Sequence, residues 1–266
     1  MIDVHCHILP EVDDGSDSWE ESFDIIRMEI SGGTKGFITT PHVLDSPDLN
    51  RVSLFQARLT ELRIRLVDEG IALELYPGAE VYPFPAAIKA IDDGVPLTMA
   101  GSGKYVLVDT PFSQMPHDFD TFIFDLRSRG ITPILAHPER STAFQSDPAR
   151  MIECVRLGAV LQVNAGSLKD RYGPVANSFA QRLLARRMAH FVASDTHRPS
   201  RAPTLGTFRD SQSEALGTDY VNLLTTLSPR AVVEGRPLPD LPEAPSEPDK
   251  GWLHKTFGRD KNPFTF

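Results

Sequence analysis

Residues 1–10 read MIDVHCHILP, an apolar run that carries His5 and His7. The run is typical of a β-strand, and alternate side chains of a strand share one face. His5 and His7 therefore point the same way and could bind one metal ion. Cys6, between them, is expected to point into the wall of the protein as a small buried hydrophobic residue. One isolated His-x-His pair is more often an ordinary surface pair, so its meaning depends on the rest of the chain.

Three later polar clusters each follow a short apolar run. They are Pro41-His42, His137-Pro138-Glu139-Arg140 and Ser194-Asp195-Thr196-His197. Together with the opening stretch they hold five of the eight histidines. Between the apolar runs lie amphipathic stretches with helical spacing, such as 19–31 and 52–68, so the chain contains seven predicted strand-helix units. Repeated units of this kind predict a parallel sheet.

The positions of the clusters distinguish a closed barrel from an open sheet. A closed barrel brings the carboxyl ends of all its strands to one rim, whereas an open sheet gathers only those near its switch point. We therefore expect an α/β fold in which residues 1–236 form a distorted, TIM-like (β/α)7 barrel. Residues 237–266 are rich in proline and then basic and aromatic, which predicts a C-terminal tail. This tail either has no role or contacts a partner or a membrane.

Composition excludes several classes of protein. The formal net charge of −9 argues against broad attraction to nucleic acid or to an anionic membrane. The two cysteines, Cys6 and Cys154, offer no disulfide framework, and the N-terminus lacks the pattern of a secretory signal. No apolar run approaches the ~20 residues that span a bilayer. We expect a cytoplasmic protein without a transmembrane segment.

Residue types that bind metal ions stand at the ends of the predicted strands. The candidate ligands are His5, His7, Asp13 or Asp14, His42, Glu80, Asp109, His137, Asp195 and His197. This many donors suits up to three ions. Imidazole and carboxylate ligands without thiolates fit manganese, iron or zinc, and the many oxygen donors favour manganese or iron.

Such a cluster of ions predicts chemistry on phosphate esters. Divalent ions about 4 Å apart clamp a phosphate group and lower the pKa of a bridging water molecule. Arg140 stands close to the candidate ligand His137 and is placed to donate a forked pair of hydrogen bonds to phosphate oxygens. A cysteine-based tyrosine phosphatase is excluded, because it needs an arginine six positions after its nucleophile, where this chain has Val12 and Val160. The residues thus predict a metal-dependent phosphoesterase.

Four spaced motifs resemble those of a known superfamily. They are Met1 to Pro10 with Asp13-Asp14-Gly15, Ala136-His137-Pro138-Glu139-Arg140, Asn164-Ala165-Gly166-Ser167-Leu168 and Ala193-Ser194-Asp195-Thr196-His197. In this order they are similar to motifs of the polymerase and histidinol phosphatase (PHP) superfamily. The similarity is greatest to its branch of bacterial manganese-dependent protein tyrosine phosphatases of capsule and exopolysaccharide synthesis. The resemblance implies a PHP-type barrel with two or three manganese ions.

The resemblance also implies roles for the matched residues. The first ion would be bound by His5, His7, Glu80 and Asp195, the second by Glu80, Asp109 and His137, and the third by His42, His197 and either Asp13 or Asp14. Arg140 and Arg201 would bind the phosphate, and loss of His42 would disable the enzyme. The chain departs from the branch at Asp109, where glutamate is usual, and at Ser141, where an aromatic residue is common.

The function implied by the resemblance is hydrolysis of phosphotyrosine on a partner protein, such as the tail of a bacterial tyrosine kinase that controls polysaccharide export. Two other functions remain open at this point. One is a phosphatase that acts on a small molecule such as histidinol phosphate. The other is a module that retains metal and binds phosphorylated proteins without turnover. A nuclease is disfavoured by the acidic charge, because nucleic-acid backbones favour basic grooves.

Overall fold

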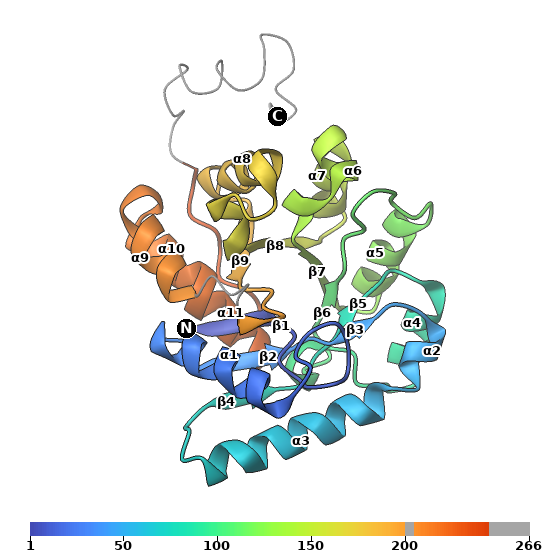
Figure 1. Ribbon diagram of the computed structural model, residues 1–266. Coiled ribbons are helices and arrows are strands. Elements are labelled where there is room, and N and C mark those ends of the chain that lie inside the picture. The colour runs from blue at the N-terminus through green and yellow to red at the C-terminus, as the bar shows by residue number, and fades with distance from the viewer. Residues whose placement is uncertain (200–204, 245–266) are drawn as a thin grey trace.

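The structure, a computed structural model, describes residues 1–199 and 205–244. The strands are β1 (Ile2–Cys6), β2 (Gly36–Thr39), β3 (His42–Val43), β4 (Glu74–Tyr76), β5 (Glu80–Val81), β6 (Tyr105–Val108), β7 (Thr132–Ala136), β8 (Val160–Asn164) and β9 (Ala189–Ala193). The α-helices are α1 (Trp19–Ser31), α2 (Ser46–Leu49), α3 (Val52–Asp68), α4 (Pro85–Asp92), α5 (Phe119–Ser128), α6 (Thr142–Ser146), α7 (Pro148–Arg156), α8 (Gly173–Ala185), α9 (Leu205–Leu216), α10 (Thr218–Asn222) and α11 (Ser228–Val233). Shorter helical segments are η1 (Met99–Gly101), η2 (Pro138–Arg140), η3 (Ala165–Lys169) and η5 (Leu223–Leu227). Figure 1 shows the helices around the outside of the strands.

The paired strands are parallel throughout. They form a three-stranded sheet in the order β1-β2-β4 and a six-stranded sheet in the order β3-β5-β6-β7-β8-β9. The sheets meet where a parallel bridge joins Cys6 of β1 to Thr196, just beyond β9. There the backbone N–H of His7 donates to the carbonyl oxygen of Thr196 at 2.9 Å. The predicted α/β fold with parallel sheets is confirmed.

Two of the expected strands are each broken into two short pieces. The break between β2 and β3 contains Pro41, and the break between β4 and β5 contains Pro77 and Gly78. Proline cannot donate a hydrogen bond to a neighbouring strand, so regular pairing stops at these positions. A Cβ atom at Gly78 would lie only 2.9 Å from Cγ2 of Ile38, so the close approach of the two broken strands requires glycine.

The two helices predicted at 19–31 and 52–68 form as α1 and α3. Ser18 caps α1, because its Oγ accepts a hydrogen bond from the backbone N–H of Glu21 at 3.2 Å. The Glu21 carboxylate in turn accepts from the backbone N–H of Asp17 at 2.9 Å. Helix α3 buries one apolar stripe, formed by Val52, Phe55, Leu59, Leu62 and Leu66. Both helices therefore pack their apolar faces against the sheets and leave their polar faces in solvent.

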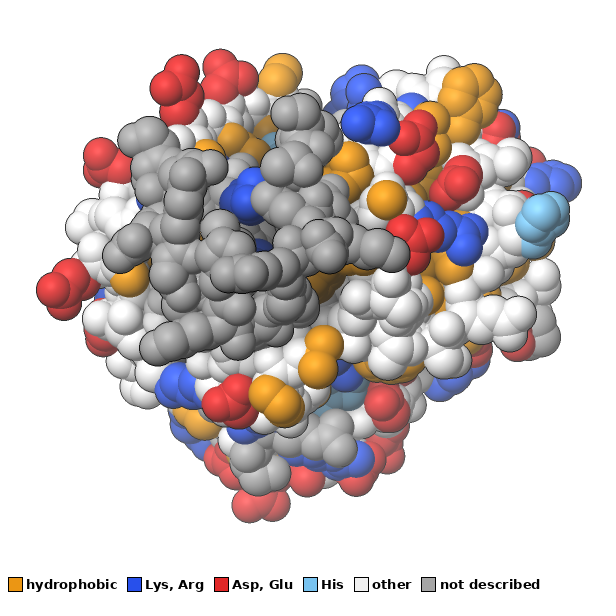
Figure 2. Space-filling model, turned by 90° about the horizontal axis from the view of Figure 1, so that it is seen from above, with side chains coloured by type: hydrophobic (Ala, Val, Ile, Leu, Met, Phe, Trp, Pro, Cys, Tyr) orange, Lys and Arg blue, Asp and Glu red, His pale blue; other side chains and the backbone are white. Residues whose placement is uncertain are grey.

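The predicted tail begins in contact with the rest of the chain. The Tyr105 hydroxyl donates to the carbonyl oxygen of Arg236 at 2.6 Å, and Leu238 and Leu241 pack against the buried core. Residues 245–266, which hold most of the predicted tail, lie outside the described residues. No helix in the described part of the chain combines the length and apolar character needed to cross a membrane. On the face shown in Figure 2, acidic and basic side chains are interspersed with hydrophobic ones.

The half-buried His190 of β9 gives the unfolding free energy a pH dependence that can be measured. Burial lowers the pKa of His190 from 6.5 to about 4. The unfolded chain takes up a proton at this ring near pH 6.5, whereas the folded protein does so only at lower pH. The native protein should therefore lose unfolding free energy as the pH falls from about 6.5 to about 4. We expect His190→Gln to lose less over this range, as measured by urea denaturation. The same substitution at the exposed His117 is the matched control, and equal slopes in both variants would contradict the prediction.

Candidate metal centre

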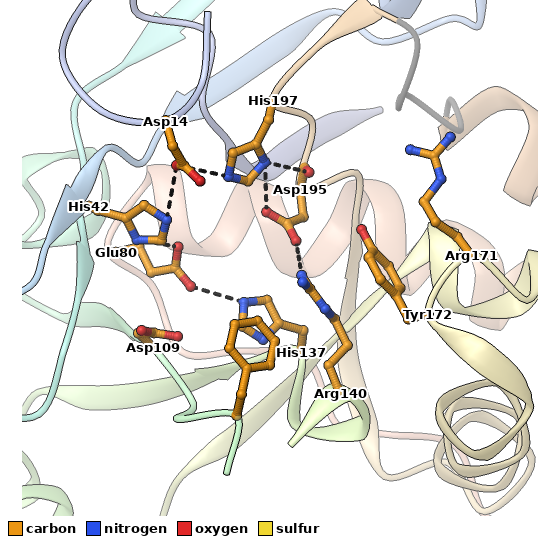
Figure 3. A pocket seen from close by; sticks show the side chains of 11 residues that line it. Asp14, His42, Glu80, Asp109, His137, Arg140, Arg171, Tyr172, Asp195 and His197 are labelled. Atoms are coloured by element: carbon orange, nitrogen blue, oxygen red, sulfur yellow. Dashed lines mark hydrogen bonds and ion pairs between the residues drawn. The ribbon is translucent and has the colours of Figure 1, made fainter. Parts of the chain in front are cut away.

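A pocket of about 580 Å³ gathers polar side chains from several strand ends. Its lining residues are Asp14, His42, Glu80, Asp109, Phe112, His137, Arg140, Arg171, Tyr172, Asp195 and His197 (Figure 3). Asp109 and His137 directly follow β6 and β7, and Asp195 stands two residues beyond β9. The structure thus brings together predicted residues that are far apart in the sequence.

Four predicted ligands converge on one point. Nε2 of His5 lies 3.1 Å from Nε2 of His7 and 3.0 Å from Oε2 of Glu80. Oδ1 of Asp195 lies 3.4 Å from Nε2 of His5 and 3.5 Å from Nε2 of His7. Atoms that bind one ion at about 2.1 Å lie about 3.0–3.5 Å from one another. The four donors therefore have the mutual spacing of ligands to a common ion.

A second group of donors surrounds Asp14. Ligand atoms of His7, Asp14, His42 and His197 all lie within 4.8 Å of one another. Oδ1 of Asp14 is 3.3 Å from Nε2 of His197 and 3.5 Å from Nε2 of His42 (Figure 3). The rings of His7 and His197 stack with their centroids 4.0 Å apart. This group shares His7 with the first, so two ions bound there would be neighbours.

Asp13 lies behind His7 and differs from Asp14 in its contacts. Its Oδ2 is 2.7 Å from Nδ1 of His7 and accepts from the backbone N–H of His42 at 3.1 Å. Its Oδ1 accepts from the backbone N–H of Gly15 at 3.0 Å. A carboxylate at Nδ1 favours the tautomer whose Nε2 is free to bind an ion. The sequence did not show whether Asp13 or Asp14 is the metal ligand. Their positions make Asp14 the candidate ligand and Asp13 the residue that orients His7.

Glu80 connects the first group to the region of Asp109. The ligand atoms of His42, Glu80 and Asp109 lie within 4.8 Å of one another. Oε1 of Glu80 is 3.1 Å from Nε2 of His137, while its Oε2 faces His5. Burial, followed by the neighbouring Glu80 carboxylate, raises the pKa of Asp109 to about 8. Glu80 therefore has the position of a carboxylate that bridges two ions.

The charges in the pocket favour a bound cation. Burial lowers the pKa of His5, but the Glu80 and Asp195 carboxylates outweigh it and raise this pKa to about 9. Burial raises the pKa of Asp195, but His5 and His137 outweigh it and lower this pKa to about 2. The carboxylates therefore create a negative potential at the centre of the pocket, and a divalent ion is the strongest local charge that could neutralise it.

Two side chains of β8 support these donors. Oε1 of Gln162 is 2.9 Å from Nδ1 of His5, and its Nε2 donates to Oδ1 of Asn164 at 2.8 Å. Nδ2 of Asn164 donates to Oδ2 of Asp195 at 2.6 Å. This chain of contacts orients His5 and Asp195 toward each other. Sequence reasoning gave Gln162 no role, although two amides on one face of an apolar strand were an available signal.

Arg140 contacts Asp195 in the pocket. Its Nη1 donates to Oδ2 of Asp195, and its guanidinium carbon lies 4.0 Å from the ring centroid of Tyr172 and 4.9 Å from that of Phe112. Within residues 1–199 and 205–244, the Nε of Arg140 has no hydrogen-bond partner. Arg140 thus keeps donors for a ligand in the pocket. The other predicted phosphate-binding residue, Arg201, lies outside the described residues.

Three lining residues were missed by sequence reasoning. Phe112, Arg171 and Tyr172 stand in the connections that follow β6 and β8. Residues in loops show no periodic pattern, and none of the three stands beside a predicted ligand in the sequence. The fold alone brings them to the pocket, and Figure 3 shows Tyr172 beside Arg140.

Two residues of the centre have left-handed backbone conformations. The φ angle is 35° at His137 and 50° at Asp195. This region costs a residue other than glycine about 1–2 kcal/mol. Contacts with neighbours hold both residues in place: the backbone N–H of Asp195 donates to the carbonyl oxygen of His5 at 2.9 Å, and that of His137 donates to Gln162 at 3.4 Å. The sharp turns point both side chains into the pocket.

The donors fit a divalent metal ion. They are imidazole nitrogens and carboxylate oxygens, and Nδ1 of His137 is buried with no partner among the described residues. Cys6 is fully buried, and its Sγ lies 3.5 Å from the carbonyl oxygen of Ile38, away from the histidines as predicted. A mixed nitrogen and oxygen set without thiolate suits manganese, iron or zinc.

Comparison with known proteins places the chain in a family. The sequence profile of the family described as capsular polysaccharide synthesis, CpsB/CapC, matches residues 1–234. The chain is 32% identical over 197 residues to the tyrosine-protein phosphatase YwqE of Bacillus subtilis (strain 168), which covers 74% of this chain and 77% of YwqE. It is 27% identical over 245 residues to the tyrosine-protein phosphatase CpsB of Streptococcus pneumoniae, covering 88% and 98% of the two chains.

Solved structures agree with this placement. The fold matches the crystal structures of YwqE and CpsB, which are described as unique metal-dependent tyrosine phosphatases, with a TM-score of 0.83 and 27% identity over 93% of this chain and 100% of the other. The histidinol phosphate phosphatase of Lactococcus lactis is similar in fold alone, with a TM-score of 0.50 and 15% identity over 82% and 94% of the two chains. The predicted resemblance is thereby confirmed. The chain belongs to the capsular polysaccharide synthesis CpsB/CapC family.

Proposed function

We propose that this protein is a metal-dependent protein tyrosine phosphatase, which hydrolyses phosphotyrosine by attack of a water molecule and acts in capsule or exopolysaccharide synthesis. The observation that carries the proposal is the convergence of His5, His7, Glu80 and Asp195 beside Arg140. A cation site next to a guanidinium is suited to a phosphate dianion. The relatives YwqE and CpsB are named for the same activity.

The proposed ligands form three groups, of which the first two share Glu80. They are His5, His7, Glu80 and Asp195 for the first ion, Glu80, Asp109 and His137 for the second, and His42, His197 and Asp14 for the third. The shared position of Glu80, its proximity to His42 and the contacts of Asp13 with His7 support this division. We propose manganese, with iron and zinc as alternatives for the same donors. Ions bound there would stabilise charge on phosphate oxygens and lower the pKa of a water molecule.

The remaining side chains would bind the phosphate or orient the residues that bind it. Oδ2 of Asp195 accepts from Arg140 and Asn164, while its Oδ1 faces His5. One carboxylate thus positions the guanidinium relative to the ion site. The guanidinium of Arg140 would donate to a phosphate oxygen as a charge-assisted hydrogen bond. Arg201 remains a predicted second phosphate ligand.

The architecture that we propose around this site is a closed, distorted (β/α)7 barrel of the PHP type. The bridge between Cys6 and Thr196 supports closure, because it places the first strand beside the last. Counting β2 with β3 and β4 with β5 as single broken strands gives seven. We further propose that residues 1–236 form the catalytic domain and that 237–266 form a C-terminal tail, which either has no role or contacts a partner or a membrane.

The proposed substrate is a phosphotyrosine protein in the cytoplasm, in particular the tail of a bacterial tyrosine kinase. An open pocket of about 580 Å³ with aromatic lining residues supports a side chain that carries both a ring and a phosphate. The family's link to capsular polysaccharide synthesis supports a partner that acts in this process.

Phosphate release from a phosphotyrosine peptide in the presence of added manganese tests the proposed function. We expect kcat/KM for the peptide to exceed that for histidinol phosphate by at least about tenfold, since an additional ring contact contributes roughly 1 kcal/mol and peptide contacts add to it. Preference for histidinol phosphate would assign the protein to small-molecule phosphatases. Metal-dependent peptide binding without release of phosphate would identify a binding module.

A further inference from the structure

Phe112 is exposed but firmly held beside the pocket. Its side chain is 53% exposed, although it is a large hydrophobic residue. The backbone N–H and Oγ1 of Thr142 donate to the carbonyl oxygen of Phe112 at 2.6 and 2.7 Å, and Oγ of Ser141 donates to that of Pro111 at 2.7 Å. These bonds fasten the loop after β6 to the start of α6. The backbone that carries the exposed ring is thus held in place, which pre-organises this part of the loop for contact with a ligand.

The ring of Phe112 lies next to both parts of the candidate site. It is parallel to the ring of His137, with the two centroids 6.0 Å apart. The guanidinium carbon of Arg140 lies 4.9 Å from the centroid of Phe112 and 4.0 Å from that of Tyr172, which are cation–π distances. Arg140 is therefore held by two aromatic rings from different loops, and one of these rings has an exposed surface.

An apolar groove continues from this pocket on the far side of Phe112. Phe112 and Asp109 line both hollows. The groove is further lined mainly by apolar side chains, among them Leu44, Phe84, Pro111 and Met115. A substrate whose phosphate lies at Arg140 can thus extend past the phenyl ring along an apolar path.

We propose that Phe112 makes the site selective for aryl over alkyl phosphates, and that Tyr172 is a positioning residue for Arg140. The inference rests on the proposed phosphatase function. With the phosphate at Arg140, the group on the ester oxygen adjoins Phe112. An aryl group packs on this ring in an offset-stacked or edge-to-face arrangement, which contributes more than the contact of a small alkyl group. The site would thereby distinguish phosphotyrosine from aliphatic phosphate esters before any chemistry occurs.

Binding of two phosphonates that cannot be hydrolysed tests the proposal without turnover. Phenylphosphonate and ethylphosphonate are titrated into the manganese-loaded protein by calorimetry. We expect the native protein to bind phenylphosphonate at least about fivefold more tightly. Phe112→Leu should bring this ratio close to one by weakening phenylphosphonate more than ethylphosphonate, whereas Phe112→Tyr, the matched variant that retains the ring, should preserve it. A native protein without preference, or a preference that survives in Phe112→Leu, would overturn the proposal.

Two variants of Tyr172 and an assay of hydrolysis complete the test. Tyr172→Leu is expected to weaken both phosphonates equally, because it acts through Arg140, and Tyr172→Phe is expected to restore them. Circular dichroism establishes that each variant folds. Hydrolysis of phenyl phosphate is measured in parallel. Aryl preference without hydrolysis would leave this inference standing and overturn the proposed function, whereas hydrolysis with an unchanged preference in Phe112→Leu would overturn this inference alone.

Discussion

Replacement of Glu80 by glutamine is expected to lower kcat for the phosphotyrosine peptide by about 10³-fold or more, since a metal site supplies several kcal/mol of charge stabilisation. Oε2 of Glu80 lies 3.0 Å from Nε2 of His5, and its Oε1 lies 3.1 Å from Nε2 of His137. Glutamine keeps the shape of the side chain but removes the negative charge and replaces one oxygen with an NH₂ group that cannot bind a cation. Steady-state kinetics and metal content by mass spectrometry measure both consequences.

A matched substitution shows whether this effect is specific to Glu80 or follows from the loss of any carboxylate. Glu20→Gln makes the same change on the exposed face of α1, and we expect it to retain the native kcat. Circular dichroism and thermal melting of both variants report on the fold. If Glu80→Gln kept its bound metal and a kcat within tenfold of the native value, Glu80 would not be a metal ligand.

Removal of divalent ions by a chelator is expected to reduce phosphate release to background and to lower the melting temperature. Glu80 and Asp195 are buried and Asp109 is half-buried at the pocket, and removal of the ions takes away the bonds that these carboxylates and the neighbouring histidines would make to metal. A ligand present at about 100 times its Kd contributes about 2.7 kcal/mol, which corresponds to a shift of roughly 5–10 °C for a chain of this size. Calorimetry and a phosphate assay measure the two effects on one sample.

The control for this experiment is chelator that has been saturated with manganese before addition. It should leave both activity and melting temperature unchanged, and later addition of manganese to the chelated protein should restore them. Titration with iron and zinc in place of manganese ranks the metals for the same donors. Undiminished turnover in protein shown to contain no metal would refute the metal-dependent mechanism.

Much of the fold was predictable because its signals are local. The apolar stripe of α3 and the cap at Ser18 specify helices within a single turn or two of sequence. The breaks after β2 and β4 were not predicted. Pro41 and Pro77 were an available local signal for them, but the close packing of Gly78 against Ile38 joins segments forty residues apart. No window of sequence contains both sides of such a contact.

The residues of the candidate site were likewise predictable only in part. His5 and His7 were recognisable because strand geometry puts them on one face, and His137 because it follows an apolar run. The choice between Asp13 and Asp14 required the position of the His7 ring. Ser141, first noted as a departure from the family pattern, proved to hold the loop that carries Phe112. Such roles arise between loops and leave no periodic trace in the sequence.

The left-handed backbone of His137 and Asp195 has an evolutionary consequence. Glycine would adopt these φ angles with less strain, so selection for a stable chain alone would favour glycine at both positions. With histidine and aspartate at these positions, stability and the proposed activity oppose each other at the same two residues. A lineage that lost its phosphorylated partner would be expected to acquire substitutions at these two positions first, gaining stability as it lost activity.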